Sequence, residues 1–543
     1  MLVNRDQLIR IIERTYPFSL ASDQEVYRLA ESADVVFFEA GKIIFQEGAS
    51  ARYIYLIIEG AVEILKEEKQ KLQLLNQMSP EMIFGEDTIC PNHSRRSSAR
   101  AQKDTILIRL EKSLIDVTFS GNDEIRKAID LLATSYEMLI EKHQLMLSEN
   151  EAIHYMGRPH YFFFIVKSLT SLTLYTLLSG VGVFLFLNRI ILAATLIWTI
   201  SIITSLFILF VAWRYIEWRN DHYIFTNKRV ICEDRVMLLH DFRFEIPLGA
   251  IVNLNIRKNF FGRNFSFGDL SIKTFTGLNR LKHVHEVDII SRLLEFLWKK
   301  DRIDFRKGEQ KAFEWAIKNQ SVSDDEQLIL LTDDIPRENE QPGGLAASFI
   351  NRFLKLQIQK DDSIIYHTHW IILIRKTVFP AFLMFSALML YIYLSVNKFS
   401  LVENRSFVFF IFITLAVCLV WWVYQYADWR RDQYIITPEQ IMDVNRRPFG
   451  TEDLRTAPIK NIQSIRYKRS GLLGLLLNFG TVFIRVGDDE LTFDQVYDPA
   501  AIQQVLFLSL EKYLSEQKRT DLTEQQQRMA DWISSYLESE KQN

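Results

Sequence analysis

The stretch FGEDTICPNHSRRSS, which begins at residue 84, combines residue types that suit a small anionic ligand. Gly85 lets the backbone approach a ligand closely, because it has no side chain. The residues after it can begin a short helix whose free N–H groups face a phosphate. Arg95 can form a bidentate, charge-assisted pair with that phosphate, and Glu86 offers an acceptor for a sugar hydroxyl. The stretch therefore predicts a phosphate pocket at Gly85, Glu86, Arg95, Arg96 and Ser97.

The residues around this stretch predict the elements that must position it. Residues 37–65 alternate short apolar runs with turns at Gly41, Gly48 and Gly60, which indicates a barrel of short strands. A long helix is predicted over about 122–150, with one apolar face that packs on the barrel or, as the alternative, forms a short coiled-coil homodimer. The residues of that face are Ile125, Ile129, Leu132, Tyr136 and Leu139.

Residues 10–150 resemble the cyclic nucleotide-binding domain family, through the spacing of their glycines, the FGE motif and an arginine nine residues on. The resemblance implies that Glu86 binds the ribose 2′-hydroxyl of cAMP or cGMP, that Arg95 binds the cyclic phosphate, and that the final helix closes over the ligand. Ala101 fits the family's small residue six positions after the arginine.

Three positions depart from that family's pattern. Asp87 brings a negative charge close to the expected phosphate, Arg96 replaces a small residue, and Ser97 stands where alanine is usual. A barrel of this family that binds no nucleotide is therefore the alternative.

Four uncharged stretches are long enough to cross a bilayer, for which about 20 apolar residues are needed. They cover residues 168–187, 190–213, 377–396 and 406–426, and the short links between them predict two helical hairpins. Basic residues flank the outer ends, whereas the tips hold only Arg189, Lys398 and Arg405. This asymmetry predicts an inner (plasma) membrane protein with both termini and all soluble domains in the cytoplasm.

The membrane stretches contain no acidic residue and no filter-like loop, which disfavours a transporter or an ion pore. Tyr175, Ser179 and Thr204 are interpreted as groups that pack helix against helix.

The chain contains an internal repeat with an offset of about 211 residues. WRNDHYIFT at 218–226 matches WRRDQYIIT at 429–437, and FGDLSI at 267–272 matches FGTVFI at 479–484. Alternating apolar and polar residues predict short strands, and each copy ends in an amphipathic helix. A hairpin followed by WRxDxYIxT and LLGLLLNFGTVFI resembles the bacterial pleckstrin-homology-like (PH-like) membrane family, over about 150–300 and 360–515. The resemblance implies paired spans before a PH-like barrel.

Basic residues stand beside aromatic or leucine residues at one place in each copy, RKNFFGRNF at 257–265 and KRSGLLGLLLNF at 468–479. This pattern predicts contact with anionic lipid headgroups. The alternative is that the apolar residues pack on the barrel or on the membrane helices. The candidate surface residues are Arg257, Lys258, Phe260, Phe261, Arg263, Lys468 and Arg469.

The 543 residues are too many for one core, and a net charge of -3 gives no basic field for nucleic acid. The expected fold class is an α+β multidomain membrane protein: an N-terminal β-barrel or jelly roll, four transmembrane helices and two PH-like β-barrels, each with a C-terminal helix. The expected domains are 1–150, hairpin 160–213, PH-like 214–302, linker 303–348, hairpin 369–426, PH-like 427–518 and an amphipathic helix 519–543.

These features predict a non-enzymatic bacterial membrane receptor or regulator that binds a cyclic nucleotide and couples it to the duplicated scaffold. The alternative is a structural, lipid- or protein-interacting membrane protein whose N-terminal barrel binds no nucleotide. No nucleophile–base set, Walker loop or metal cluster is present in the sequence, so no enzyme, metal or cofactor is expected. The expected partners are the lipid bilayer and the nucleotide; the protein partner is left open.

Overall fold

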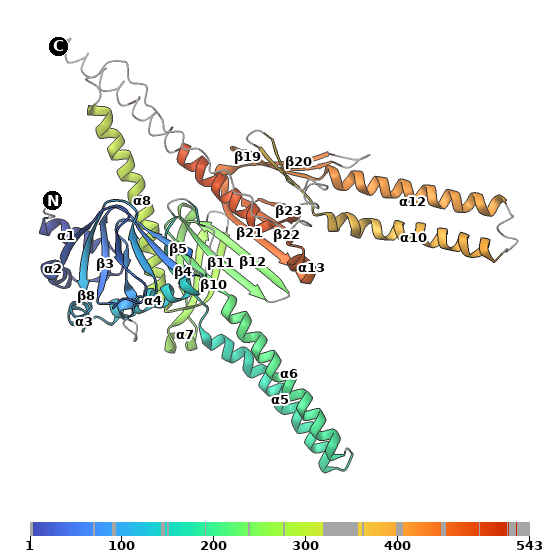
Figure 1. Ribbon diagram of the computed structural model, residues 1–543, viewed down its shortest axis with the longest axis horizontal. Coiled ribbons are helices and arrows are strands. Elements are labelled where there is room, and N and C mark those ends of the chain that lie inside the picture. The colour runs from blue at the N-terminus through green and yellow to red at the C-terminus, as the bar shows by residue number, and fades with distance from the viewer. Residues whose placement is uncertain are drawn as a thin grey trace, which may run out of the picture. The chain divides into compact units, whose positions relative to one another are not determined.

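The structure is a computed structural model and describes residues 4–68, 71–89, 94–142, 147–148, 151–190, 192–236, 239–274, 277–318, 357–360, 363–397, 405–446, 452–487, 489–517, 520 and 528 (Figure 1). The chain divides into two compact units. The first unit comprises Met1–Met237 with Asp241–Phe305, and the second comprises Leu238–His240 with Arg306–Asn543.

The first unit begins with two helices and two four-stranded sheets. Helices α1 (Arg5–Glu13) and α2 (Asp23–Ser32) precede sheets with the strand orders β1-β8-β3-β6 and β2-β7-β4-β5. Their strands are β1 Asp34–Phe38, β2 Ile43–Phe45, β3 Tyr53–Glu59, β4 Val62–Glu68, β5 Lys71–Met78, β6 Ile83–Phe84, β7 Ser98–Ala101 and β8 Thr105–Glu111.

The sheets are jelly-roll-like, which confirms the jelly-roll form of the prediction, and they do not close into a barrel in the residues that the structure describes. Strand β6 is only two residues long and pairs with β3 alone, while β5 pairs with β4 alone. The two sheets therefore keep separate edges and are joined through side chains rather than through a continuous hydrogen-bond ladder.

Helix α4 spans Asp123–Glu141 after the short α3 (Lys112–Thr118), so it ends before the predicted boundary at 150. The chain then forms β9 (Ile153–Gly157), which pairs with β10 and buries Tyr155 and Met156. The chain forms a strand here and does not continue the helix, because a strand gains both hydrogen bonds to β10 and burial of its apolar side chains. The predicted apolar face of α4 is buried within the chain, so it is not available to form the coiled-coil homodimer that was the alternative.

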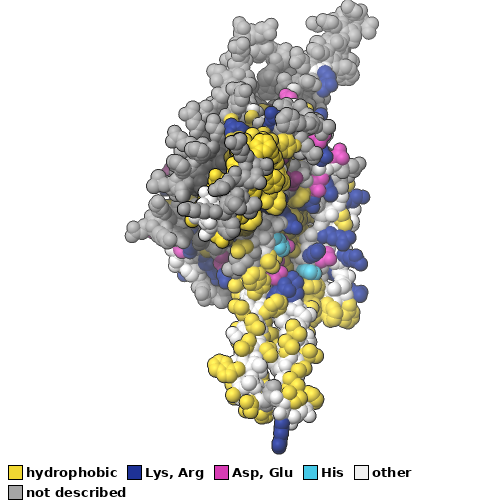
Figure 2. Space-filling view, turned by 90° about the vertical axis from the view of Figure 1, so that its right-hand side faces the viewer, with side chains coloured by type: hydrophobic (Ala, Val, Ile, Leu, Met, Phe, Trp, Pro, Cys, Tyr) yellow, Lys and Arg dark blue, Asp and Glu magenta, His cyan; other side chains and the backbone are white. Residues whose placement is uncertain are grey.

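Four helices are long and apolar enough to cross a membrane. They form two hairpins, α5 (Tyr161–Leu187) with α6 (Ala193–Asn220) and α10 (Trp370–Val396) with α12 (Arg405–Arg431). Hydrophobic and uncharged side chains cover most of the visible face of the α5–α6 hairpin, the lower projection in Figure 2. The hydroxyls of Tyr175 and Thr204 lie 3.2 Å apart across this hairpin, which supports their interpretation as packing groups.

The first copy of the repeat follows α6 and consists of two open sheets and a helix. Strands β9, β10, β11 and β12 lie side by side in that order, and β13, β14 and β15 form a second sheet. Their bounds are β10 His222–Thr226, β11 Arg229–Val236, β12 His240–Pro247, β13 Ile251–Arg257, β14 Phe267–Thr274 and β15 Gly277–His285. The short helix α7 (Phe260–Asn264) precedes β14, and α8 (Val287–Lys318) closes the segment.

The second copy has the same order of elements inside the second unit. Strands β16 to β20 form one sheet in sequence order, and β21, β22 and β23 follow. Their bounds are β16 Gln357–Lys360, β17 Ser363–His367, β18 Gln433–Ile436, β19 Gln440–Arg446, β20 Glu452–Pro458, β21 Ile462–Ser470, β22 Phe479–Val486 and β23 Asp489–Tyr497. Helix α13 (Gly471–Leu476) takes the place of α7, and residues 499–517 form the final helix.

Backbone details recur at equivalent positions of the two copies. Non-glycine residues have a positive φ at Ser266 and Asn478, at His283 and Gln495, and at Glu286 and Asp498. The register shifts between Gly268 and Leu270 in one copy and between Gly480 and Val482 in the other. In the residues that the structure describes, both copies form open sheets and not the predicted PH-like β-barrels.

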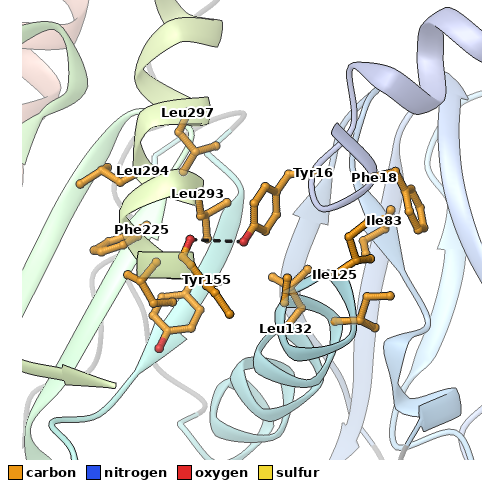
Figure 3. Packing of buried hydrophobic residues seen from close by; sticks show 14 of the residues in the cluster. Tyr16, Phe18, Ile83, Ile125, Leu132, Tyr155, Phe225, Leu293, Leu294 and Leu297 are labelled. Carbon is orange, nitrogen blue, oxygen red and sulfur yellow. Dashed lines mark hydrogen bonds between the residues drawn. The ribbon is translucent and has the colours of Figure 1, made fainter. Parts of the chain in front are cut away.

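One hydrophobic core joins the N-terminal sheets to the first copy of the repeat (Figure 3). Figure 3 shows Leu132 of α4 on one side and Leu293 of α8 on the other, with Tyr16 between them. The Tyr16 hydroxyl donates a hydrogen bond to the Ile289 carbonyl oxygen at 3.3 Å. The second unit has its own core, which includes Tyr467, Phe493 and Leu506.

Two stretches of the predicted domain plan fall partly outside the described residues. Helix α8 continues to Lys318, into the predicted linker 303–348, and the rest of that linker lies outside the described residues. The predicted C-terminal helix 519–543 also lies outside them, apart from two residues.

Candidate functional site

The candidate site lies where β6 meets the short 3-10 helix η2 (Glu86–Ile89), and Gly85 forms the turn between them. Gly85 has a φ of +83°, which other residues rarely adopt. A Cβ atom at this position would lie 2.8 Å from Nη1 of Arg95 and 3.1 Å from the Tyr53 carbonyl oxygen. Glycine is therefore required both by the turn and by the close approach of the arginine.

Arg95 reaches this turn from the other side of the site and is buried. Its guanidinium donates hydrogen bonds to the Gly85 carbonyl oxygen at 2.9 Å and to the Tyr53 carbonyl oxygen at 2.6 Å. The guanidinium carbon also lies 4.0 Å from the centre of the Phe45 ring, a cation–π distance. The sequence thus brings Gly85 and Arg95 together, as the predicted pocket requires.

Asp87 provides the anionic partner of this arginine. Its Oδ1 accepts a hydrogen bond from Nη1 of Arg95, and both side chains are 1% exposed. Its Oδ2 accepts from the backbone N–H of Arg96 at 3.1 Å. One carboxylate thus takes a guanidinium donor and a neighbouring backbone donor, which are the kinds of group that a phosphate at this loop would use.

Glu86 is buried beside this pair and points into a small cavity. One of its carboxyl oxygens, Oε2, has no hydrogen-bond partner among the described residues. Burial, together with the nearby charge of Asp87, raises the pKa of Glu86 to about 8. The cavity, lined also by Ser135, Tyr136 and His154, has a volume of about 40 Å³. Ligand pockets are roughly 300 Å³ or larger, so this one has room for water only.

Helix α4 covers the remaining two predicted residues. The Ser97 and Tyr136 hydroxyls form a hydrogen bond, and Arg96 forms an ion pair with Glu137 at 2.5 Å. Burial raises the pKa of Tyr136 well above its usual range, so its hydroxyl stays protonated. The helix that the resemblance expects to close over a ligand is therefore closed over the arginine-containing loop itself.

All five predicted pocket residues lie within this one cluster, but sequence reasoning missed much of what surrounds them. It noted the charge of Asp87 as a neighbour of the phosphate and not as the partner of Arg95. It did not find Phe45, Tyr53 or a site role for Tyr136. These residues come from two strands and a helix far from the motif, and no local spacing in the sequence joins them to it.

The second set of predicted site residues lies around α7 and α13. Arg257, Phe260, Phe261 and Arg263 are exposed, whereas Lys258 is half-buried and pairs with Asp288. In the other copy Lys468 is exposed, and Arg469 is half-buried and lies 3.3 Å from Asp498.

Family comparisons agree with the architecture of the first unit. Residues 35–120 match the cyclic nucleotide-binding domain family, and residues 168–294 match the bacterial PH domain family. The chain therefore contains a cyclic nucleotide-binding domain near its N-terminus and a bacterial PH-like domain after it. Such an N-terminal domain is typical of a ligand-binding regulatory protein. No curated protein matches the chain.

Several solved structures resemble the N-terminal domain. A cyclic nucleotide-binding-like protein from Brucella abortus is 26% identical, and the match covers 21% of this chain and 99% of that chain, with a TM-score of 0.20. The sensor domain of the transcriptional regulator DNR from Pseudomonas aeruginosa is 19% identical over 26% of this chain and 98% of that chain (TM-score 0.23). The regulatory domain of Toxoplasma gondii PKA, solved with cAMP, is 18% identical over 26% of this chain and 51% of that chain (TM-score 0.21).

Proposed function

We propose that this protein is a non-enzymatic bacterial membrane regulator whose cyclic nucleotide-binding domain controls the PH-like domain packed against it. The two apolar hairpins anchor it in the inner membrane with its soluble domains in the cytoplasm. The ligand is cAMP or cGMP, and its phosphate competes with the carboxylate of Asp87 for Arg95. The second copy of the repeat is a second PH-like module.

The observation that carries this proposal is the continuous core between α4 and the first copy of the repeat. Leu132 of α4 and Leu293 of α8 belong to the same buried cluster, and α4 also holds the candidate pocket shut through Tyr136. A ligand that prefers another position of α4 must therefore change the contacts of the PH-like domain. It shifts the equilibrium by the difference between its affinities for the two positions.

In this proposal the carboxylate of Asp87 occupies the place of the ligand phosphate while the site is empty. This explains why Arg95, a residue suited to a phosphate, forms an ion pair within the protein. Removing one partner of a buried ion pair costs about 3–5 kcal/mol, because the other charge stays buried and unpaired. A phosphate that takes the place of the carboxylate avoids this cost at Arg95 and leaves only Asp87 to be moved into water. Asp87 therefore lowers the affinity for the nucleotide and keeps the empty domain closed.

A second candidate function is a scaffold whose N-terminal domain binds no nucleotide. The ion pair between Arg95 and Asp87 favours this function, because Asp87 neutralises the buried charge of Arg95 without a ligand. The small volume beside Glu86 points the same way. In this case the domain serves as a fixed contact module for the PH-like domain.

Calorimetric titration of the purified full chain with cAMP and cGMP distinguishes the two functions. The full chain is needed because the N-terminal domain shares its core with the first copy of the repeat. Asp87→Asn is expected to bind at least tenfold more tightly than the wild type, which corresponds to about 1.4 kcal/mol. Arg95→Gln is expected to abolish binding. Arg100→Gln, which lies outside the predicted pocket and loses the ion pair of the half-exposed Arg100 with Glu63, is the matched control and should change the affinity little.

Absence of heat for both the wild type and Asp87→Asn, with folded protein, would exclude the nucleotide receptor and leave the scaffold. Coupling is checked by hydrogen exchange. Saturating nucleotide is expected to change the protection of α4 and α8 together and to leave the 499–517 helix of the second unit unchanged.

A further inference from the structure

We propose that α7 and the residues beside it form a lipid-binding surface that lies in the headgroup layer of an anionic bilayer. This α7 surface consists of Arg257, Phe260, Phe261, Arg263 and Phe265. The inference rests on one part of the proposed function, the crossing of the membrane by α5 and α6. It is independent of whether the N-terminal domain binds a nucleotide.

The phenylalanines of the α7 surface face outward although the domain has a well-packed core. Phe260 is 65% exposed, Phe261 50% and Phe265 46%. The alternative from sequence, in which these side chains pack on the barrel or on the membrane helices, does not describe Phe260. It fits Phe261 and Phe265 in part, because both rings lie against Phe162 in the first turn of α5. Three neighbouring exposed aromatic rings mark a contact surface, because soluble proteins rarely leave such groups in water together.

The backbone of α7 is fixed in a way that keeps these rings outward. The Asn259 side chain caps the helix by accepting a hydrogen bond from the Gly262 N–H at 2.7 Å. A Cβ atom at Gly262 would lie 2.4 Å from the Phe267 carbonyl oxygen, so this side of the helix lies directly against β14. Because the side of α7 that contains Gly262 has no space for a side chain, the phenylalanines lie on the opposite, exposed side.

The α7 surface lies beside the point where the first apolar hairpin begins. Phe162, in the first turn of α5, has its ring centre 5.6 Å from that of Phe261 and 5.4 Å from that of Phe265. Figure 1 shows α7 near the base of the α5–α6 hairpin. If that hairpin crosses a bilayer, α7 is held at the level where the bilayer surface must lie.

The charges around α7 select the kind of lipid. Arg257 and Arg263 are exposed and can reach headgroups, while Lys258 is partly neutralised by Asp288. A basic residue near an anionic bilayer is attracted to its negatively charged headgroups. Aromatic rings favour the boundary between headgroups and acyl chains. The combination fits phosphatidylglycerol or another anionic lipid better than a neutral surface.

The second copy of the repeat carries an equivalent surface in α13. Leu472, Leu473 and Leu476 are all exposed, the last of them by 70%, and Lys468 precedes them. Phe479, three residues after Leu476, stacks on His369, which caps the first turn of α10. Each unit thus places a short apolar helix near the start of its own hairpin, although the residues differ in type.

Depth measurements on the full chain in nanodiscs test this surface. An environment-sensitive fluorophore is attached to Phe260→Cys in a Cys90→Ser background, since Cys232 and Cys418 are buried. Leu209→Cys on α6 is the control for a membrane-embedded site, and Val117→Cys on α3 is the control for an aqueous site; both side chains are well exposed. Nitroxide-labelled lipids are expected to quench positions 209 and 260, whereas aqueous iodide is expected to quench position 117.

The three sites separate the possible failures. Iodide quenching at 260 with lipid quenching at 209 would overturn the α7 surface and leave the membrane crossing intact. Lack of lipid quenching at 209 would overturn the crossing itself. Protection of 260 from both quenchers would show that protein covers the surface, which also overturns the lipid proposal.

The charge contribution is tested by adding Arg257→Gln and Arg263→Gln to the labelled chain. Replacing phosphatidylcholine by phosphatidylglycerol is expected to increase lipid quenching at 260 at least twofold in the parent, and the two substitutions are expected to remove this increase. An unchanged increase would overturn the role of the two arginines. Leu476→Cys on α13 is expected to behave like Phe260→Cys.

Discussion

The two copies of the repeat have the same joints between hairpin and sheet but very different buried charge. In the first copy the backbone N–H of His160 donates to the His283 carbonyl oxygen at 2.8 Å, and in the second His369 donates to Gln495 at 2.7 Å. In each hairpin, a tryptophan near the end of the second helix donates its indole N–H to a backbone carbonyl oxygen just before the first helix. These pairs are Trp218 to Pro159 at 2.7 Å and Trp429 to Thr368 at 2.9 Å.

Among the residues that the structure describes, a network of buried ion pairs is found in the first copy and not in the second. Arg229 lies 2.8 Å from Glu151 and 2.6 Å from Glu245, and all three side chains are almost completely buried. Arg243 joins Glu245 to Glu233, which also pairs with a lysine at the end of α4. At the four corresponding positions 211 residues on, the second copy has Gln440, Val444, Leu454 and Thr456.

This difference shows that the buried charges belong to the junction with the N-terminal domain and not to the fold of the repeat. Glu151 and Lys142 lie before β9, in the segment that leads from α4 to the first copy. Although burial alone would raise the pKa of Glu233, the charges of Lys142 and Arg243 lower it to about 2. Glu233 therefore stays ionised at neutral pH, and its ion pairs hold this segment against the sheet.

Removing the centre of the network should have the largest effect. Arg229→Met leaves Glu151 and Glu245 buried without their shared partner and is expected to destabilise the first unit by about 3–5 kcal/mol. Gln440→Met, at the exposed corresponding position, should change the second unit by less than about 0.5 kcal/mol. Hydrogen exchange of the full chain reports each unit separately. Equal effects of the two substitutions would mean that the network contributes nothing to the junction.

Glu86 should give the first unit a pH dependence that has no counterpart at the equivalent place of the repeat, because it comes from the N-terminal domain. Burial raises its folded-state pKa to about 8, against 4.5 in the unfolded chain. Between pH 4.5 and about pH 8, Glu86 therefore keeps a proton in the folded protein that it has lost in the unfolded chain. The destabilisation is absent below pH 4.5 and grows as the pH rises to about 8. Glu86→Gln should be more stable than the wild type by about 4 kcal/mol at pH 7.5 and close to it near pH 4.5.

The measurement is the difference in hydrogen exchange between wild type and Glu86→Gln in peptides that cover β6 and η2. Taking the difference removes the contributions that the two proteins share. A difference that does not change between pH 4.5 and 7.5 would show that Glu86 is ionised in the folded protein.

The smallest expected effect tests the similarity of the two copies. Trp218→Phe and Trp429→Phe each leave one carbonyl oxygen without its indole donor, and each should cost about 1 kcal/mol. Thermal unfolding of the two variants should show shifts of similar size. A much larger loss for one of them would mean that the two joints are not equivalent.

Most of the local architecture could be predicted from the sequence because it depends on local patterns. The four apolar helices, the amphipathic face of α4 and the repeat with its offset of 211 residues all follow from periodicity. The end of α4 could not be predicted, because residues 142–150 carry no strong helix stop, and β9 forms only by pairing with β10. The open edges of the sheets depend on strand pairing that no local pattern specifies.

The candidate site shows the same division. The motif itself fixes the left-handed turn at Gly85 and the distance along the chain to Arg95, so their meeting was predictable. The choice of Asp87 as the partner of Arg95 depends on where the η2 helix points. The loop that carries Arg95 is in turn held by α4, where Tyr136 and Glu137 contact Ser97 and Arg96 from about 40 residues away in the sequence.

The sequence by itself determined the helices, the repeated unit and the residue types of the pocket, because hydrophobic periodicity and turn chemistry act over a few residues. Tertiary structure alone decided which charges are buried together. Arg229 with Glu151, and Arg95 with Asp87, become ion pairs only when packing removes water from both partners, and desolvation depends on the whole surrounding fold.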